Sequence, residues 1–286
     1  MLSTLNKYLS LIKFSHTIFA LPFALIGFAM GIHSGKAVFS FEKLVLVILC
    51  MVFARSAAMA FNRFIDRRFD ARNPRTASRE IPAGLISPRA ALALVIISSL
   101  AFMVCAYRIN ALCFYLSPLA LLVVLGYSYT KRFTPLCHLV LGAGLALASI
   151  GAYLALTEQF DLAPLILSFA VFFWVSGFDI IYALQDDEFD KSQSLKSIPV
   201  VLGRTNALRL SRSFHVFCAA LLGSLFFIGD FGFLYLIGLA AFVALLIYQQ
   251  LLVKPNDLSR VTLAFGTTNG IASVVFCVFV SSDIFF

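Results

Sequence analysis

The stretch LAPLILSFAVFFWVSGFDIIYAL, which runs from Leu162 to Leu184, is apolar along its length and carries Asp179 as its one charged residue. A helix needs about 20 mostly apolar residues to cross the roughly 30 Å of hydrocarbon in a bilayer, and this stretch has that length. Similar runs recur along the whole chain. The sequence therefore predicts an all-α integral membrane bundle.

Nine segments of this kind are expected to be transmembrane helices. They are Phe14–Ile32, Leu44–Phe61, Ala90–Ala106, Ala111–Tyr129, His138–Leu156, Leu162–Leu184, Leu208–Ile228, Phe231–Leu252 and Val261–Val280. Most connections between them are short, as is usual for antiparallel neighbours in a bundle. No separate soluble domain fits between the spans, so residues 1–286 are expected to form a single membrane domain.

The composition and the placement of charge support this class. Hydrophobic residues make up 61% of the chain and charged residues 13%, whereas soluble domains carry about 25% charged residues. Most of the basic residues behind the net charge of +8 fall in alternate loops, as in the cytoplasmic loops of membrane proteins. We expect a bacterial-type cytoplasmic (inner) membrane protein with a cytoplasmic N-terminus, an outer C-terminus and no nucleic-acid partner. No protein partner can be inferred.

Two loops on the predicted cytoplasmic side are long, polar and rich in charges of both signs. They cover roughly residues 62–89 and residues 185–206, and each follows an apolar span directly. Each loop opens with two aspartates four residues apart. These aspartates are Asp66 and Asp70 in the first loop and Asp186 and Asp190 in the second.

The spacing of these aspartates suggests a metal site. Residues four apart lie on one face of a helix, so each pair points one way if the preceding helix continues into the loop. Mg²⁺ suits sparse carboxylates, because it keeps several waters and accepts phosphate oxygens as further ligands. Two facing sites of this kind would clamp a diphosphate. The alternative is that the aspartates are simply paired with nearby arginines.

Arg55 lies within a predicted span, where a charge is costly and usually functional. Its spacing places it on one helix face with Asn62, Asp66 and Asp70. Asp179 is the matching charge inside another predicted span. The structural alternative is that Arg55 and Asp179 neutralise each other.

These residues carry a resemblance to a known family. The first loop, NRFIDRRFDARNPRTASREIPAG, is similar to the NxxxDxxxD motif and the following R-T-x-x-R stretch of the UbiA family of membrane prenyltransferases. The second, FDIIYALQDDEFDKSQSLKSIP, resembles the D-x-x-Y-A-x-x-D-x-x-x-D motif of that family, and YSYTKR resembles its Y-x-x-x-K element. With FSHTIFALPFALIG in the first span, the resemblance covers nearly the whole chain, and the paired motifs are highly specific.

The resemblance implies a central cavity, Mg²⁺ held by both aspartate motifs, and transfer of a polyprenyl group from a polyprenyl diphosphate to an aromatic carboxylate acceptor. The implied metal ligands are Asp66, Asp70, Asp186 and Asp190. The implied diphosphate-binding residues are Asn62, Arg75, Lys131 and Tyr127. The residues assigned to the aromatic substrate are Arg55, Asp179 and Tyr182. Asp66 and Asp186 are the candidate catalytic residues, and Asp66 is the candidate base for the proton that the ring releases.

This chain departs from the family pattern at Arg63. Many family members have an aspartate directly after the motif asparagine, and the exchange removes one carboxylate and adds a cation. Because Asp66 and Asp70 remain, metal binding is expected to survive. One interpretation is that the side chain of Arg63 points away from the site.

The acceptor is less defined than the reaction. 4-Hydroxybenzoate, the acceptor of the ubiquinone route, is the default for the family. The stretches SHTIFALPFA and NPRTASREIPAG look closer to a branch of menaquinone biosynthesis, whose acceptor is a dihydroxynaphthoate. Both acids have a carboxylate that Arg55 would bind. The prenyl tail would lie between helices in membrane lipid.

Other functions are less consistent with the pattern. A lipid-headgroup phosphotransferase would carry a D-G-x-x-A-R motif, which the sequence does not contain. A haem-type farnesyltransferase needs no acidic ring on its acceptor, so a substrate assay separates it from the proposed activity. A transporter would use Arg55 and Asp179 along a pathway through the bilayer, but the polar residues cluster at one membrane face and not at the midplane.

Overall fold

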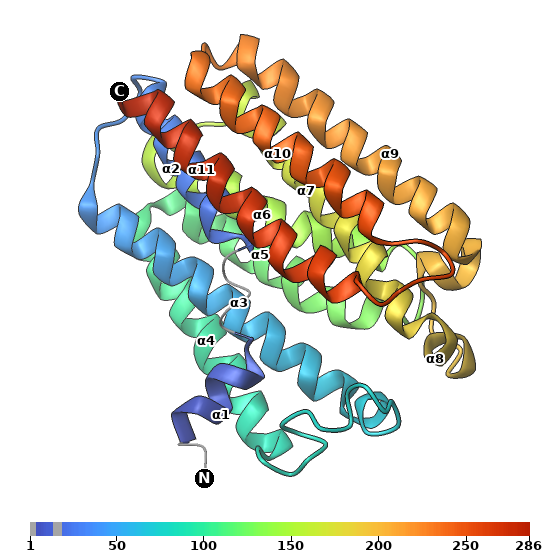
Figure 1. Cartoon of the computed structure of the whole chain (residues 1–286). Coiled ribbons are helices and arrows are strands. Elements are labelled where there is room, and N and C mark those ends of the chain that lie inside the picture. Colours follow the sequence, from blue (N-terminus) through green and yellow to red (C-terminus); the bar gives the residue numbers. More distant parts are fainter. Residues whose placement is uncertain (1–3, 14–18) are drawn as a thin grey trace.

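The computed structural model describes residues 4–13 and 19–286, and every regular element in these residues is helical (Figure 1). The α-helices are α1 (Thr4–Leu11), α2 (Leu21–His33), α3 (Phe41–Asp70), α4 (Pro88–Ile109), α5 (Ala111–Thr130), α6 (Cys137–Thr157), α7 (Leu162–Ala183), α8 (Asp187–Ser192), α9 (Ile198–Ile228), α10 (Phe233–Leu252) and α11 (Asn269–Phe285). A 3-10 turn, η2 (Leu184–Asp186), joins α7 to α8, and a π-helical turn, η3 (Leu263–Thr268), precedes α11. The prediction of an all-α fold is confirmed.

Eight helical segments of the described chain are long and apolar enough to cross a membrane. They are α3, α4, α5, α6, the segment Leu162–Ser192, α9, α10 and the segment Leu263–Phe285. The predicted first span, Phe14–Ile32, is not among them. Its residues 14–18 lie outside the described residues, and α2 has 13 residues, which span only about 20 Å. Nine crossings therefore stay a prediction.

Two helices continue into segments that the apolar pattern assigns to loops. α3 runs without a break to Asp70, so the first aspartate pair lies on a helix. The predicted loop at residues 185–206 is largely helical, because α8 lies within it and α9 begins at Ile198. Charged side chains can be hydrated while the backbone hydrogen bonds of a helix continue. The apolar run therefore marks where the hydrocarbon ends and not where the helix ends.

The start of α9 is bent at Gly203, whose φ of 73° and ψ of 161° are open to glycine and strained for other residues. The next residue, Arg204, forms ion pairs with α8. Its Nε lies 2.5 Å from Asp187 Oδ2, and its Nη2 lies 2.9 Å from Glu188 Oε1. These contacts tie the second aspartate segment to α9.

α7 lies at the centre of the bundle, where it packs against α6 and α9 and is the most buried of the long helices. Its Trp174 is fully buried, with ring centroids 4.9 Å from Phe23 of α2 and 5.7 Å from Phe242 of α10. Trp174 Nε1 donates to Asn269 Oδ1 of α11 at 3.1 Å, so its one polar atom is satisfied. This aromatic core fixes α2, α7, α10 and α11 relative to one another.

The two aspartate segments lie at the same end of the bundle. In Figure 1 the C-terminal end of α3 and the short helix α8 are at this end, and the end of α11 is at the opposite one. Arg72 Nη1 on the first loop donates to Gln193 Oε1 after α8 at 3.3 Å. α1 is also at this end, where the Ser10 hydroxyl donates to Glu80 at 2.5 Å.

The packing of α2 on α6 depends on Gly27. A Cβ at this position would lie 2.1 Å from the carbonyl oxygen of Ser149. We expect Gly27→Ala to lower the free energy of unfolding by about 1–3 kcal/mol, because the two helices would have to separate. Thermal unfolding of the purified protein in detergent would report this as a lower melting temperature. Gly126→Ala is the control, since a Cβ there meets no atom within 4 Å. Equal melting temperatures for the two variants would contradict the close contact.

Candidate active site

A cavity of about 810 Å³ lies between α2, α3, α4, α5, α6 and α7. A volume of this size accommodates a ligand of several rings or a long chain. One part of its wall is polar and contains several of the residues that the sequence predicts. They are Arg55, Asn62, Arg75, Tyr127, Asp179 and Tyr182.

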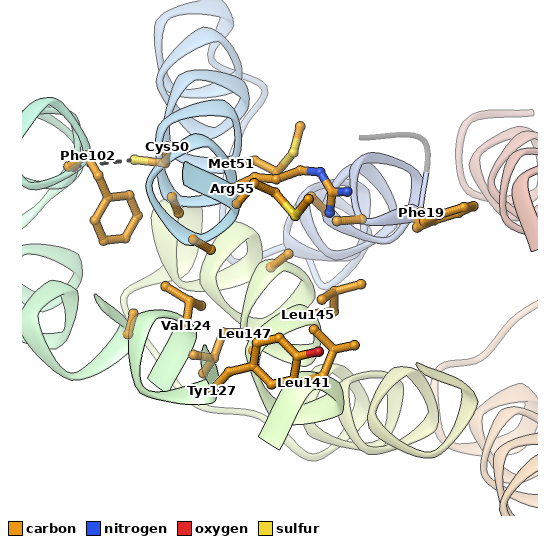
Figure 2. A pocket seen from close by; sticks show the side chains of 18 of the residues that line it. Phe19, Cys50, Met51, Arg55, Phe102, Val124, Tyr127, Leu141, Leu145 and Leu147 are labelled. Carbon is orange, nitrogen blue, oxygen red and sulfur yellow. Dashed lines mark hydrogen bonds between the residues drawn. The ribbon is translucent and has the colours of Figure 1, made fainter. Parts of the chain in front are cut away.

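The rest of the cavity wall is mostly apolar. In Figure 2, Phe102 from α4, Val124 from α5 and Leu145 from α6 lie around the same space. Burial of hydrocarbon against such a surface stabilises a bound chain by about 0.8 kcal/mol per CH₂. The cavity therefore joins a polar region to a region suited to an aliphatic tail.

Arg55 extends into the cavity from α3, and Tyr127 extends into it from α5 (Figure 2). Among the described residues, none is an ion-pair or hydrogen-bond partner of the Arg55 side chain, and its buried Nε is unsatisfied. A buried charge without a partner is strongly unfavourable. An anionic ligand group is the compensation that the cavity leaves room for.

Asp179 does not neutralise Arg55. Its Oδ2 lies 2.7 Å from Nδ1 of His138, which is buried at the start of α6. The backbone N–H of Ile198 donates to Nε2 of the same imidazole at 3.4 Å, so the ring proton is on Nδ1 and donates to Asp179. The alternative of an Arg55–Asp179 pair is wrong for this structure.

Asp186, at the end of η2, is bound by the first loop. Arg75 forms a fork with both carboxylate oxygens, with Nε 2.9 Å from Oδ1, and Asn73 Nδ2 donates to Oδ1 at 2.9 Å. Arg75 Nη1 also donates to the Tyr182 hydroxyl at 3.0 Å. Burial alone would lower the pKa of Arg75, but the hydrogen bonds that it donates to Asp186 raise its pKa above the ordinary value. The first loop is therefore docked on the second aspartate motif.

Asp66 is held from two directions on the last turns of α3. Asn62 Nδ2 donates to its Oδ2 at 3.0 Å, one helical turn away. Arg132, which follows α5, donates to its Oδ1 at 2.9 Å. The two motif residues of α3 and a cation after α5 thus form one hydrogen-bonded group.

The remaining two aspartates are also paired with cations. Lys131 Nζ lies 2.6 Å from Asp190 Oδ2, and Arg79 Nη1 lies 2.6 Å from Asp70 Oδ1. Burial alone would lower the pKa of Lys131, but the charge of Asp190 raises it above its ordinary value. Because Lys131 and Arg132 are adjacent, one turn after α5 contacts both aspartate motifs.

The residues fit Mg²⁺ in chemistry. Four carboxylates and an amide oxygen suit this ion, and Asp70 Oδ2 is buried without a hydrogen-bond partner. Within residues 4–13 and 19–286, no three His, Cys, Asp or Glu side chains lie together as a ready metal site. Each of the four predicted aspartate ligands is instead paired with a cation. The pairing of aspartates with basic residues, the alternative interpretation of the loops, is thus present. The ion pairs would have to open for the carboxylates to reach a metal.

The structure separates the predicted residues into two groups. One group lines the cavity, as given above. The other surrounds the cavity at the aspartate end without lining it, and consists of Asp66, Asp70, Asp186, Asp190 and Lys131. The two groups are joined, because Asn62 and Arg75 belong to the cavity wall and hydrogen-bond to Asp66 and Asp186.

Three residues with clear contacts were missed by reasoning from the sequence, and one of them is Arg132, which holds Asp66 from the turn after α5. Asn73 holds Asp186 from the first loop, and His138 holds Asp179 from α6. The position of Asn73 between the first aspartate motif and the arginine stretch that follows it was an available signal. Nothing in the spacing of His138 indicated a partner 41 residues later.

Comparison with known proteins gives a consistent set of relatives. The UbiA prenyltransferase family matches residues 20–281. The 4-hydroxybenzoate octaprenyltransferase of Cronobacter sakazakii is 31% identical over 222 residues, which cover 78% of this chain and 76% of that protein. The protein of the same name from Aeromonas salmonicida is 31% identical over 236 residues, with 82% and 80% covered.

Solved structures show the same fold. A UbiA homolog from Aeropyrum pernix K1 matches with a TM-score of 0.81 and 31% identity, covering 94% of this chain and 96% of that one. A UbiA homolog from Archaeoglobus fulgidus bound to GPP and Mg²⁺ matches with a TM-score of 0.73 and 23% identity, covering 97% and 99%.

Proposed function

Because this chain belongs to the UbiA prenyltransferase family, we propose that it carries out the Mg²⁺-dependent transfer of a polyprenyl group from a polyprenyl diphosphate to an aromatic acid in respiratory quinone biosynthesis. The family resemblance and the class of enzyme, a transferase of prenyl groups, are confirmed by the match and by the named relatives. The metal, the acceptor and the roles of individual residues belong to the proposal.

One observation supports the proposal above the others. Two aspartate motifs 120 positions apart meet through the cations of the first loop and of the turn after α5, beside a cavity that continues into an apolar region. A polyprenyl diphosphate likewise consists of a charged diphosphate head and an apolar tail. The Archaeoglobus fulgidus homolog described as bound to GPP and Mg²⁺ shares the fold.

The donor diphosphate would bind at the aspartate end. Arg75 and Lys131 are the chain's own contacts for it, because phosphate oxygens can replace the carboxylates that these cations now contact. Asn62 and Tyr127 would contact the same group from the cavity wall. Mg²⁺, held by Asp66, Asp70, Asp186 and Asp190, would offset the negative charge that grows on the leaving group.

The acceptor would lie in the cavity with its carboxylate on Arg55. 4-Hydroxybenzoate is the acceptor named for the relatives, and it is the first candidate here. Asp179, held in place by His138, and Tyr182 would line the pocket for its ring. The alternative acceptor, a dihydroxynaphthoate, has the same carboxylate and would use the same arginine.

The reaction requires one bond exchange and one proton transfer. The C–O bond of the donor breaks, and the diphosphate leaves with the bonding electron pair. A ring carbon beside the acceptor hydroxyl forms the new C–C bond to the allylic carbon. The ring then releases its proton, and Asp66 is the proposed base. Aromatic faces such as that of Tyr127 would stabilise the allylic cation by roughly 0.5–2 kcal/mol each.

We also propose that the aspartate end faces the cytoplasm of a bacterial-type inner membrane. The basic residues of the first loop and of the turn after α5 support this orientation, since cytoplasmic loops are enriched in lysine and arginine. The prenyl tail would lie between the helices, in the membrane lipid.

The test is an assay of the purified protein in detergent or nanodiscs with a prenyl diphosphate and each acid in turn, read by mass spectrometry. We expect 4-hydroxybenzoate to gain the mass of the prenyl group, and we expect EDTA to abolish the product until excess Mg²⁺ is added. Product formation in EDTA would contradict the metal requirement. If only the dihydroxynaphthoate gives a product, it is the acceptor in place of 4-hydroxybenzoate. If neither acid gives a product, the proposed reaction is contradicted.

A further inference from the structure

Arg63 is almost completely buried, with 4% of its surface exposed, and it lines the cavity. Its Nε has no hydrogen-bond partner, and none of the residues that the structure describes lies within ion-pair distance of its guanidinium. The interpretation that it points away from the site is therefore wrong. A cation aimed into a cavity without a partner indicates a missing anion.

The carboxylates near Arg63 contact other side chains and form no ion pair with it. Asp70 and Glu80 are close enough to act on it electrostatically. Asp70 is paired with Arg79, and Glu80 accepts the hydroxyl of Ser10. Glu80 keeps its negative charge, because a serine hydroxyl does not neutralise it, so Arg63 has an acidic neighbour but, among the described residues, no carboxylate at ion-pair distance.

The position of Arg63 selects the kind of anion. It lies on the same turns of α3 as the first aspartate motif, and Arg75 and Arg79 line the same cavity. Arg55 is eight residues away along α3, or about 12 Å at 1.5 Å per residue, so the two arginines do not share one small carboxylate. The described residues of the cavity wall include five cations and two carboxylates. Two of these cations, Arg75 and Arg79, are paired with aspartates of the two motifs. The position of Arg63 beside the first aspartate motif, and not the charge count, therefore favours a diphosphate.

We propose that Arg63 binds the diphosphate of the donor directly, at a position where many family members carry an aspartate. This inference rests on the proposed function for the identity of the donor. Its consequence is that a part of the affinity for diphosphate does not require Mg²⁺, because a guanidinium of the chain replaces one metal-binding carboxylate and contacts phosphate oxygens itself.

The test is titration of the purified protein with inorganic pyrophosphate in a calorimeter, once in EDTA and once in Mg²⁺. We expect Arg63→Gln to weaken binding at least tenfold in EDTA and less in Mg²⁺, and Arg63→Lys to keep part of the affinity. Arg68→Gln is the matched control, because it removes an exposed cation from the same helix, and it should bind as the wild type does. Equal affinities for Arg63→Gln and Arg68→Gln in EDTA would overturn the proposal.

A second measurement separates binding from folding. If Arg63 served only as a counter-ion for Glu80, Arg63→Gln would lower the melting temperature, and adding Glu80→Gln would restore both stability and pyrophosphate binding, which would overturn the proposal. We expect no such rescue of binding. If the wild type binds pyrophosphate through Arg63 but forms no prenylated acid, the proposed function fails and the anion site stands. If it forms product while Arg63→Gln binds pyrophosphate normally, only the role of Arg63 fails.

Discussion

Asp186→Asn should lower the rate of prenyl transfer by at least about 100-fold, the size of effect seen when one electrostatic contact to a developing charge is removed. The asparagine keeps the shape of the side chain and can still accept from Arg75 and Asn73, which both donate to Asp186. It lacks the charge that a divalent cation requires. The measurement is the initial rate of product formation at saturating Mg²⁺, with the melting temperature recorded in parallel.

Asp187→Asn is the control for this variant. Asp187 is the next residue along the chain and loses the same charge, but its partner is Arg204 and it does not touch the first loop. We expect this variant to keep most of the activity. A wild-type rate for Asp186→Asn, or equal losses for both variants, would remove the second motif from the chemistry.

Arg55→Met should lower kcat/KM for the acid acceptor about 100-fold, or about 2.7 kcal/mol, because the carboxylate would lose the cation that is proposed to bind it. The KM of the donor should change little, since Arg55 lies away from the aspartate end. The protein should be at least as stable as the wild type, because the substitution removes a half-buried charge whose Nε has no hydrogen-bond partner.

The methyl ester of the acceptor sharpens this test. The wild type should prefer the acid to the ester strongly, and Arg55→Met should lose that preference. Arg89→Met, which removes an exposed arginine from the start of α4, is the control and should keep the preference. A variant at Arg55 that still distinguishes acid from ester would show that the carboxylate is bound elsewhere.

Much of the fold could be predicted because the bilayer imposes a simple rule on composition. The predicted span Ala111–Tyr129 matches α5 to within one residue, and His138–Leu156 matches α6 to within one at each end. The rule is weaker where a helix leaves the hydrocarbon. α9 begins ten residues before the predicted Leu208, and the ion pair of Arg204 with Asp187 holds its first turns against α8.

The helix positions of the candidate site residues could be predicted from the sequence, but most of their contacts could not. Fixed spacings place Asn62 one helical turn from Asp66, and the structure has that hydrogen bond. The partners Arg132 and His138 lie 66 and 41 residues from the aspartates that they contact, and no local periodicity encodes such distances. The pairing therefore depends on how the helices pack, which a single sequence does not reveal.

The ion pairs of the four aspartates affect how stable the protein is without magnesium. A structural zinc site is usually required for folding, because its ligands have nothing else to bind. Here a lysine or an arginine of the chain already pairs with each of the four aspartates. Removal of Mg²⁺ should therefore abolish the proposed activity without unfolding the protein. We expect the metal-free protein to stay folded in the membrane and to regain activity when Mg²⁺ is added back.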